Sequence, residues 1–85
     1  MEEIHELKTY PHYFQQTMDG KKNWECRKND RHFHVGDTVI LKEWDNITYS
    51  GREIRGTITY ILDDKFIGLA KEYVIFSLDI YERKG

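Results

Sequence analysis

The chain has 85 residues, of which 39% are hydrophobic and 14% aromatic, and its formal net charge is −2 at pH 7. These values are typical of one small folded domain, and they exclude a disordered chain, which would carry fewer aromatic residues and a stronger net charge. They also exclude a protein that binds polyanions through its overall charge, so any contact with nucleic acid needs a local basic patch. We expect residues 1–85 to form a single domain.

The N-terminal part predicts a strand followed by a short helix. Residues 4–9 alternate loosely between apolar and polar side chains, which is typical of a strand. Pro11 suits the first position of a helix, and Gly20 is a common stop signal, so we expect a helix over 11–18. The apolar spacing places one stripe of this segment in the core. The side chains expected in that stripe are Tyr10, Tyr13, Phe14, Thr17 and Met18.

The twelve residues that begin at the helix stop are locally basic, with five cationic and two anionic side chains. We expect a second strand over about 23–28. Alternate side chains of a strand share a face, so Glu25 and Arg27 point one way and Trp24 and Cys26 the other. We expect the Trp24 face to pack in the core and the Glu25 face to be polar and open to a ligand.

The rest of the chain predicts three more strands separated by turns. The expected strands are 38–44, 52–62 and about 72–81, with turns or irregular connections over 29–37, 45–51 and 63–70. Gly56, in the middle of the longest strand, indicates a bulge or the bend of a closing barrel. The tail after residue 81 is expected to fray. Five strands with one short helix after the first predict a mainly β (α+β) fold, a small and partly closed barrel.

Several motifs resemble the ASCH domain, which belongs to the PUA-like superfamily of small pseudo-β-barrels. The first is the pattern Gly20-x-Lys22-x-x-Glu25-x-Arg27, which follows the predicted helix. Other motifs are similar to a short branch from bacteria and their phages that is described only as a domain of unknown function. They are His5-Glu6-Leu7-Lys8, Arg27-Lys28-Asn29-Asp30-Arg31, Glu43-Trp44-Asp45, Tyr49-x-Gly51-Arg52 and Thr59-Tyr60-Ile61-Leu62. The resemblance covers about residues 4–80.

This resemblance implies a cleft between the helix and the following strand, where ASCH domains are proposed to bind RNA. It also implies a second hypothesis, because some small members are ribonucleases or resemble N4-acetylcytidine amidohydrolases. In the amidohydrolases a lysine after the glycine is catalytic, and Lys22 occupies that position. Their threonine nucleophile falls where this chain has Glu25, and their distal catalytic glutamate has no match here. If the chain is an enzyme, Lys22 and Glu25 are its candidate catalytic residues.

The residues that we expect to bind RNA, a nucleoside or a nucleotide fall into three groups. Lys22, Glu25 and Arg27 would line the cleft, where the carboxylate accepts from an exocyclic amino group and the cations donate to carbonyl or phosphate oxygens. The alternative for these three is a solvated strand face with weak ion pairs. The other candidates are Lys8 in the same cleft, Lys28, Arg31 and Arg52 as phosphate contacts or plain surface charges, and Trp44 and Tyr49 as a stacking platform.

The sequence indicates neither a cofactor nor a metal site. His32 and His34 can share a face of an extended segment, but no third ligand has a recognisable spacing. Cys26, the only cysteine, excludes an intrachain disulfide, and the lack of a nearby base favours a buried, inert thiol. No apolar run resembles a signal peptide or a membrane span, so we expect a cytoplasmic protein. We expect it to be a monomer or a weak dimer. A phage-type protein-interaction domain anchored by Trp44 and Tyr49 is the third hypothesis.

Overall fold

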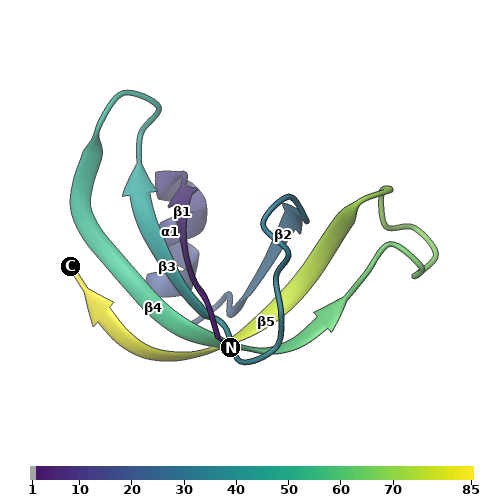
Figure 1. Cartoon of the computed structure of the whole chain (residues 1–85). Helices are drawn as coiled ribbons and strands as arrows, with labels where there is room; N and C mark the ends of the chain where they lie inside the picture. The colour runs from purple at the N-terminus through teal and green to yellow at the C-terminus, as the bar shows by residue number, and fades with distance from the viewer. Residues whose placement is uncertain (1) are drawn as a thin grey trace.

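The computed structural model describes residues 2–85, which form one helix and one five-stranded sheet (Figure 1). In chain order the elements are β1 (Ile4–Thr9), α1 (Pro11–Met18), β2 (Trp24–Lys28), β3 (Thr38–Trp44), β4 (Tyr49–Leu62) and β5 (Tyr73–Lys84). The strand order is β1-β3-β4-β5-β2. β1 pairs with β3 in parallel, and the other neighbouring strands pair antiparallel. The predicted mainly β fold, with a short helix after the first strand, is confirmed.

The sheet curls into a half-barrel, which brings its two edge strands, β1 and β2, to the same concave side (Figure 1). The pairing of β4 with β5 shifts register twice, between Arg55 and Gly56 and between Ile58 and Tyr60. Such shifts bend strands and increase their twist. A Cβ atom on Gly56 would lie 3.1 Å from the backbone oxygen of Asp79, so the close approach of the two strands favours glycine here. The predicted bulge at Gly56 is confirmed.

The hydrophobic core lies between α1 and the sheet. Alternate positions of the strands supply it, as the period-two patterns of β4 and β5 predict. Full burial of a large aliphatic or aromatic side chain contributes about 1.5–3 kcal/mol, so this cluster is the main source of stability. The buried members are Leu7, Phe14, Phe33, Val39, Leu41, Ile54, Ile58, Val74, Phe76 and Leu78.

Only part of the predicted aromatic stripe of α1 belongs to the core. Phe14 and Thr17 are buried and Met18 packs against the core, but Tyr10 and Tyr13 are each 52% exposed. Tyr10 precedes the helix and has an extended backbone conformation. Helical spacing therefore does not determine which way its side chain points. Tyr13 lies at the margin of the narrow buried stripe. In the described part of the chain, no helix is long and apolar enough to cross a membrane.

The two faces of β2 are the reverse of the prediction. Glu25 is only 3% exposed, whereas Trp24 is 46% exposed and Cys26 is also exposed. The cause is the pairing with β5, where Glu25 lies opposite the fully buried Phe76. Directly opposite residues of an antiparallel pair share a face, so Glu25 must point inward with Phe76. The prediction that Trp24 and Cys26 are buried is therefore wrong.

Two strands are longer than the sequence indicates. β4 begins at Tyr49, which was expected in a loop, and β5 continues to Lys84, which pairs with Glu53. The expected fraying after residue 81 is therefore wrong, because backbone pairing extends into the tail. Tyr60 lies two residues after the buried Ile58, a spacing that places both on one face of a regular strand, but Tyr60 is 64% exposed. The register shift between them moves Tyr60 to the other face of the sheet.

Candidate functional site

The edge strands β1 and β2 are joined by a side chain. Arg27 Nη2 donates to the backbone oxygen of Lys8 at 2.9 Å and to Thr9 Oγ1 at 3.3 Å. β1 and β2 stand at opposite ends of the strand order, so this contact closes the open side of the half-barrel. We call the junction between residues 7–9 of β1 and residues 25–27 of β2 the seam.

Glu25 is the buried centre of the seam. Its Oε1 accepts from Arg27 Nε at 3.0 Å and lies 2.8 Å from Arg27 Nη2, and its Oε2 accepts from Lys22 Nζ at 2.5 Å. A buried carboxylate needs such compensation, because an unpaired charge is costly away from water. A carboxylate has about four acceptor positions, so these three contacts leave one position on Oε2 for a further donor.

The end of α1 determines where Lys22 lies. Gly20 has a φ of +79°, and the backbone amides of Lys21 and Lys22 donate to the oxygen of Gln16 at 2.9 and 3.2 Å. This is the helix stop that the sequence predicts, because glycine takes the left-handed conformation without steric cost. The tight turn directs the Lys22 side chain back towards β2, where Nζ also donates to the backbone oxygen of Trp24 at 2.8 Å.

A cavity of about 420 Å³ opens between the start of α1, β1 and β2, and we call it the larger cavity. Its volume is within the range of about 300–1,000 Å³ that is usual for small-molecule sites. Lys22 Nζ lies 4.8 Å from the ring centroid of Trp24 and 5.8 Å from that of Tyr13, so it sits between two exposed aromatic side chains. The lining residues are Lys8, Thr9, Tyr10, Tyr13, Lys22, Trp24, Glu25, Cys26 and Arg27.

The charges around the larger cavity are unequal. Three cationic side chains, Lys8, Lys22 and Arg27, stand against the single carboxylate of Glu25. The cavity therefore carries an excess of positive charge although the whole chain is slightly acidic. This local charge and the exposed rings suit a ligand that has both a planar face and anionic or carbonyl oxygens.

A smaller cavity of about 200 Å³ shares Arg27 with the larger cavity. It is lined by Leu7, Arg27, Lys28, Asp30, Arg31 and Phe33. Arg27 thus lines both cavities, and seam residues contribute to each of them.

The structure brings six of the nine predicted site residues to the two cavities. Lys8, Lys22, Glu25 and Arg27 line the larger cavity, and Lys28 and Arg31 line the smaller one. Arg52 is elsewhere: its Nη2 donates to Gln15 Oε1 at 3.1 Å, its Nη1 lies 3.4 Å from Glu43 Oε1, and its guanidinium lies 5.0 Å from the Phe14 ring centroid. These contacts tie β4 to α1, so Arg52 is held as part of the packing between them.

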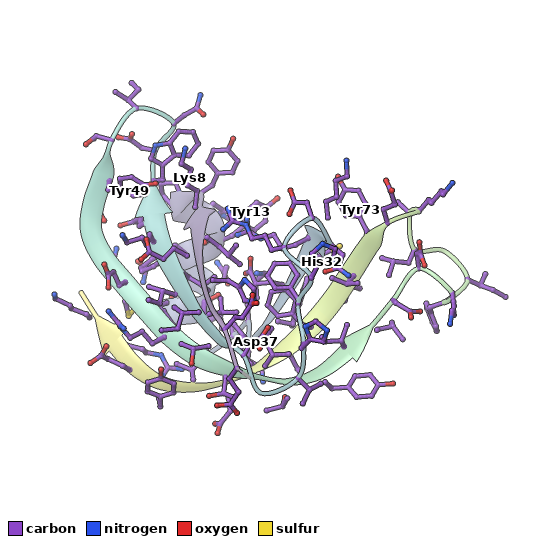
Figure 2. The ribbon with its side chains drawn as sticks, in the orientation of Figure 1. Lys8, Tyr13, His32, Asp37, Tyr49 and Tyr73 are labelled. Carbon is purple, nitrogen blue, oxygen red and sulfur yellow. The ribbon has the colours of Figure 1, made fainter. Side chains whose placement is uncertain are left out.

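Trp44 and Tyr49 lie beside the larger cavity without lining it. They are cross-strand partners of β3 and β4, at the end that points away from Asp37 (Figure 2). The Trp44 ring stacks on Tyr10 with centroids 6.0 Å apart, and Lys8 Nζ lies 4.4 Å from the Trp44 centroid. Tyr10 and Lys8 therefore connect this aromatic pair to the wall of the cavity.

Sequence reasoning missed the aromatic wall of the larger cavity. Tyr13 and Trp24 were assigned to the core, and Tyr10 was treated as part of the helix stripe. The spacing of α1 offered one usable signal, because Tyr13 falls at the edge of the stripe that contains Phe14 and Thr17. No local signal marks Trp24, because its exposure depends on the pairing of β2 with β5.

A second buried polar cluster was also missed. Asp37, 1% exposed, accepts from His5 Nε2 at 2.8 Å and from the backbone amides of Glu3 at 3.1 Å and His34 at 3.0 Å. Burial raises the pKa of Asp37, but the hydrogen bonds from His5 and the two amides outweigh it, so the pKa lies below its ordinary value. Within residues 2–85, no group of three or more His, Cys, Asp or Glu side chains is placed to hold a metal ion.

Comparison with known proteins places the chain in a family. Residues 4–78 match the family described as "Domain of unknown function (DUF3850)". An uncharacterized 12.9 kDa protein in the GpA 3′ region of Escherichia phage P2 is 43% identical over 63 residues, which are 74% of this chain and 58% of the phage protein. The chain thus spans less than two thirds of that relative. It belongs to the DUF3850 family, which agrees with the predicted phage-related branch of unknown function.

Proposed function

We propose that this DUF3850 protein is an RNA- or nucleotide-binding module of the ASCH type that holds a base in the larger cavity. The observation that carries the proposal is the combination, in one cavity, of exposed aromatic side chains and an excess of cations around a buried, paired carboxylate. Proteins that bind single-stranded nucleic acid combine stacking platforms with positive grooves in the same way. The motifs that resemble ASCH domains imply a cleft between the helix and the following strand, and this resemblance supports the same proposal.

Each part of the larger cavity has a distinct role in the proposal. Tyr13 and Trp24 offer ring faces on which a base stacks. Lys8 and Arg27 donate to carbonyl or phosphate oxygens. Glu25 keeps Lys22 and Arg27 in place, and its one remaining acceptor position suits an exocyclic amino group. Specific recognition of a base therefore depends on a single hydrogen bond, while most of the affinity comes from stacking and charge.

The main alternative is hydrolysis of a modified nucleoside, such as N4-acetylcytidine, or of RNA. In that reaction Lys22 would transfer a proton and Glu25 would activate a water molecule. Here Lys22 Nζ donates to Glu25 Oε2 and to the Trp24 backbone oxygen, so the two groups are engaged with each other. This pairing favours a binding role over proton transfer.

A protein-interaction role for the β3–β4 hairpin has less support. Trp44 is stacked on Tyr10 and approached by Lys8, so part of its ring is already covered. Arg52, the arginine expected to assist it, is engaged with Gln15 and lies near Glu43.

Calorimetric titration with single-stranded RNA hexanucleotides tests the proposal. Trp24→Ala should weaken binding by about 5- to 150-fold, since stacking of one base on an aromatic side chain contributes about 1–3 kcal/mol. The matched control is Tyr81→Ala, which removes another exposed ring, on β5, that does not line the larger cavity. Both variants should keep the wild-type free energy of unfolding within about 0.5 kcal/mol.

Two results would contradict the binding role. The first is the absence of saturable RNA binding by the wild-type protein. The second is an equal effect of Trp24→Ala and Tyr81→Ala, which would remove the larger cavity from the interaction. Release of acetate from N4-acetylcytidine, or cleavage of the RNA, with loss of that activity in Lys22→Ala, would instead support the hydrolase alternative.

A further inference from the structure

The smaller cavity carries a concentration of positive charge beside the proposed base site. Arg27, Lys28 and Arg31 supply three cations to its wall, and Asp30 supplies one carboxylate. Arg27 also lines the larger cavity, so the two cavities are direct neighbours. The planar guanidinium groups of arginine suit two-point binding of a phosphate group.

The cations of the smaller cavity are available to bind an anion. Among residues 2–85, neither Lys28 nor Arg31 forms an ion pair, whereas Arg55 and Lys42 both lie close to carboxylates. Arg27 uses Nε and Nη2 for Glu25 and for β1, and its Nη1 has no hydrogen-bond partner in the described part of the chain. An incoming phosphate would therefore displace no ion pair of Lys28 or Arg31.

The turn that carries Arg31 is anchored at both ends. Asn29 donates its backbone amide to the oxygen of Glu72 at 2.8 Å, and its Oδ1 accepts from the amide of Phe33 at 2.9 Å. Phe33 is buried in the core, with its ring centroid 4.8 Å from that of Phe76. Because the backbone of this turn is already ordered, binding an anion there costs less conformational entropy than binding to a free loop.

We infer that the smaller cavity is the phosphate subsite of the proposed base site, so that the ligand is a nucleotide, free or within RNA, and not a nucleoside. The inference rests on the proposed function. A base stacked on Trp24 and a phosphate held by Lys28 and Arg31 would both lie near Arg27, which lines the two cavities. The volumes of the two cavities agree with this assignment. The phosphate group is assigned to the smaller cavity, of about 200 Å³, and the larger base to the cavity of about 420 Å³.

Calorimetric titration of each of the four ribonucleosides and its 5′- and 3′-monophosphates tests the inference. In the wild-type protein, at least one monophosphate should bind about tenfold more tightly than its nucleoside, as expected for hydrogen bonds to a charged group. Arg31→Ala should remove most of this difference and leave the affinity for the nucleoside unchanged. The position of the preferred phosphate then shows on which side of the ribose the subsite lies.

Arg83→Ala is the matched control, because Arg83 is an exposed arginine near the far end of β5 and lines neither cavity. This variant should keep the full preference for the monophosphate. Thermal melting of all variants shows whether they remain folded, which is expected because Arg31 is exposed and carries no ion pair within residues 2–85.

The possible failures are distinguishable. Equal affinity for nucleosides and monophosphates in the wild-type protein would overturn the phosphate subsite and leave the base site standing. A loss of nucleoside affinity in Arg31→Ala, at an unchanged melting temperature, would also overturn it, because Arg31 would then contact the base or ribose. If the wild-type protein binds neither class, the inference falls, and the proposed function falls with it only if the RNA hexanucleotides also fail to bind.

Discussion

Two buried carboxylates show how polar groups serve different purposes in this small domain. Glu25 is 3% exposed and Asp37 is 1% exposed, and each accepts three contacts from protein donors. The donors to Asp37 are two backbone amides and the His5 ring, whereas the donors to Glu25 are two flexible cationic side chains beside an open cavity. Backbone donors fix the path of the chain, while side-chain cations can also contact a ligand.

This comparison predicts that Asp37 matters most for stability and Glu25 most for binding. It also separates two clusters that look alike by burial and hydrogen bonding alone.

Replacement of Asp37 should have the largest effect on folding. Asp37→Ala should lower the free energy of unfolding by about 2–4 kcal/mol, because it leaves the buried His5 ring and two backbone amides without their acceptor. Urea unfolding measures the change. The control is Asp79→Ala, an exposed carboxylate on β5, which should change stability by no more than about 0.5 kcal/mol. A loss below about 1 kcal/mol in Asp37→Ala would mean that the cluster contributes little to stability.

Replacement of Glu25 should have a moderate effect on folding and a clear effect on binding. Glu25→Gln should cost about 1–2 kcal/mol, because Lys22 and Arg27 lose the negative charge that they share. RNA affinity should fall as well, since the two cations are no longer held at the seam. In Asp37→Asn, at a residue that lines neither cavity, the affinity of the folded protein should stay within about twofold of wild type. Equal losses of affinity in both variants would contradict the division of roles.

Acid should destabilise the protein partly through Asp37, with a smaller effect than either substitution. The pKa of Asp37 in the folded protein lies below its ordinary value of 3.8. Its contribution is therefore complete above the unfolded-state pKa and is lost as the pH falls through the lower, folded-state pKa. Urea unfolding at about pH 5, 4 and 3 should show a shallower decline for Asp37→Asn than for wild type. Parallel curves would show that other carboxylates cause the acid sensitivity.

Much of the fold could be predicted from the sequence because the relevant signals are local. The alternation of residues 4–9 marks β1, and Pro11 and Gly20 mark the two ends of α1. The apolar and β-branched run over 38–44 marks β3, and Gly56 marks the bulge. Each of these signals depends on neighbouring residues or on an allowed backbone conformation, so no knowledge of distant contacts was needed.

The candidate site could be predicted only in part. The structure brings Lys22, Glu25 and Arg27 together, as the spacing and the motif led us to expect. The environment of this group was not predicted, because we assigned the apolar Trp24 face of β2 to the core. The actual arrangement buries the charged face and exposes the indole ring, which a hydrophobicity pattern cannot indicate for an edge strand that closes a seam.

The sequence by itself determined which segments are strands and helix, because side-chain periodicity, proline and glycine act within a few residues of the chain. Only the tertiary structure decided which face of β2 is buried and where the two cavities lie. The register of Glu25 against Phe76 and the contact of Arg27 with β1 join segments that are distant in sequence. They depend on how far the bulged sheet curls, and that curvature is a property of the whole sheet.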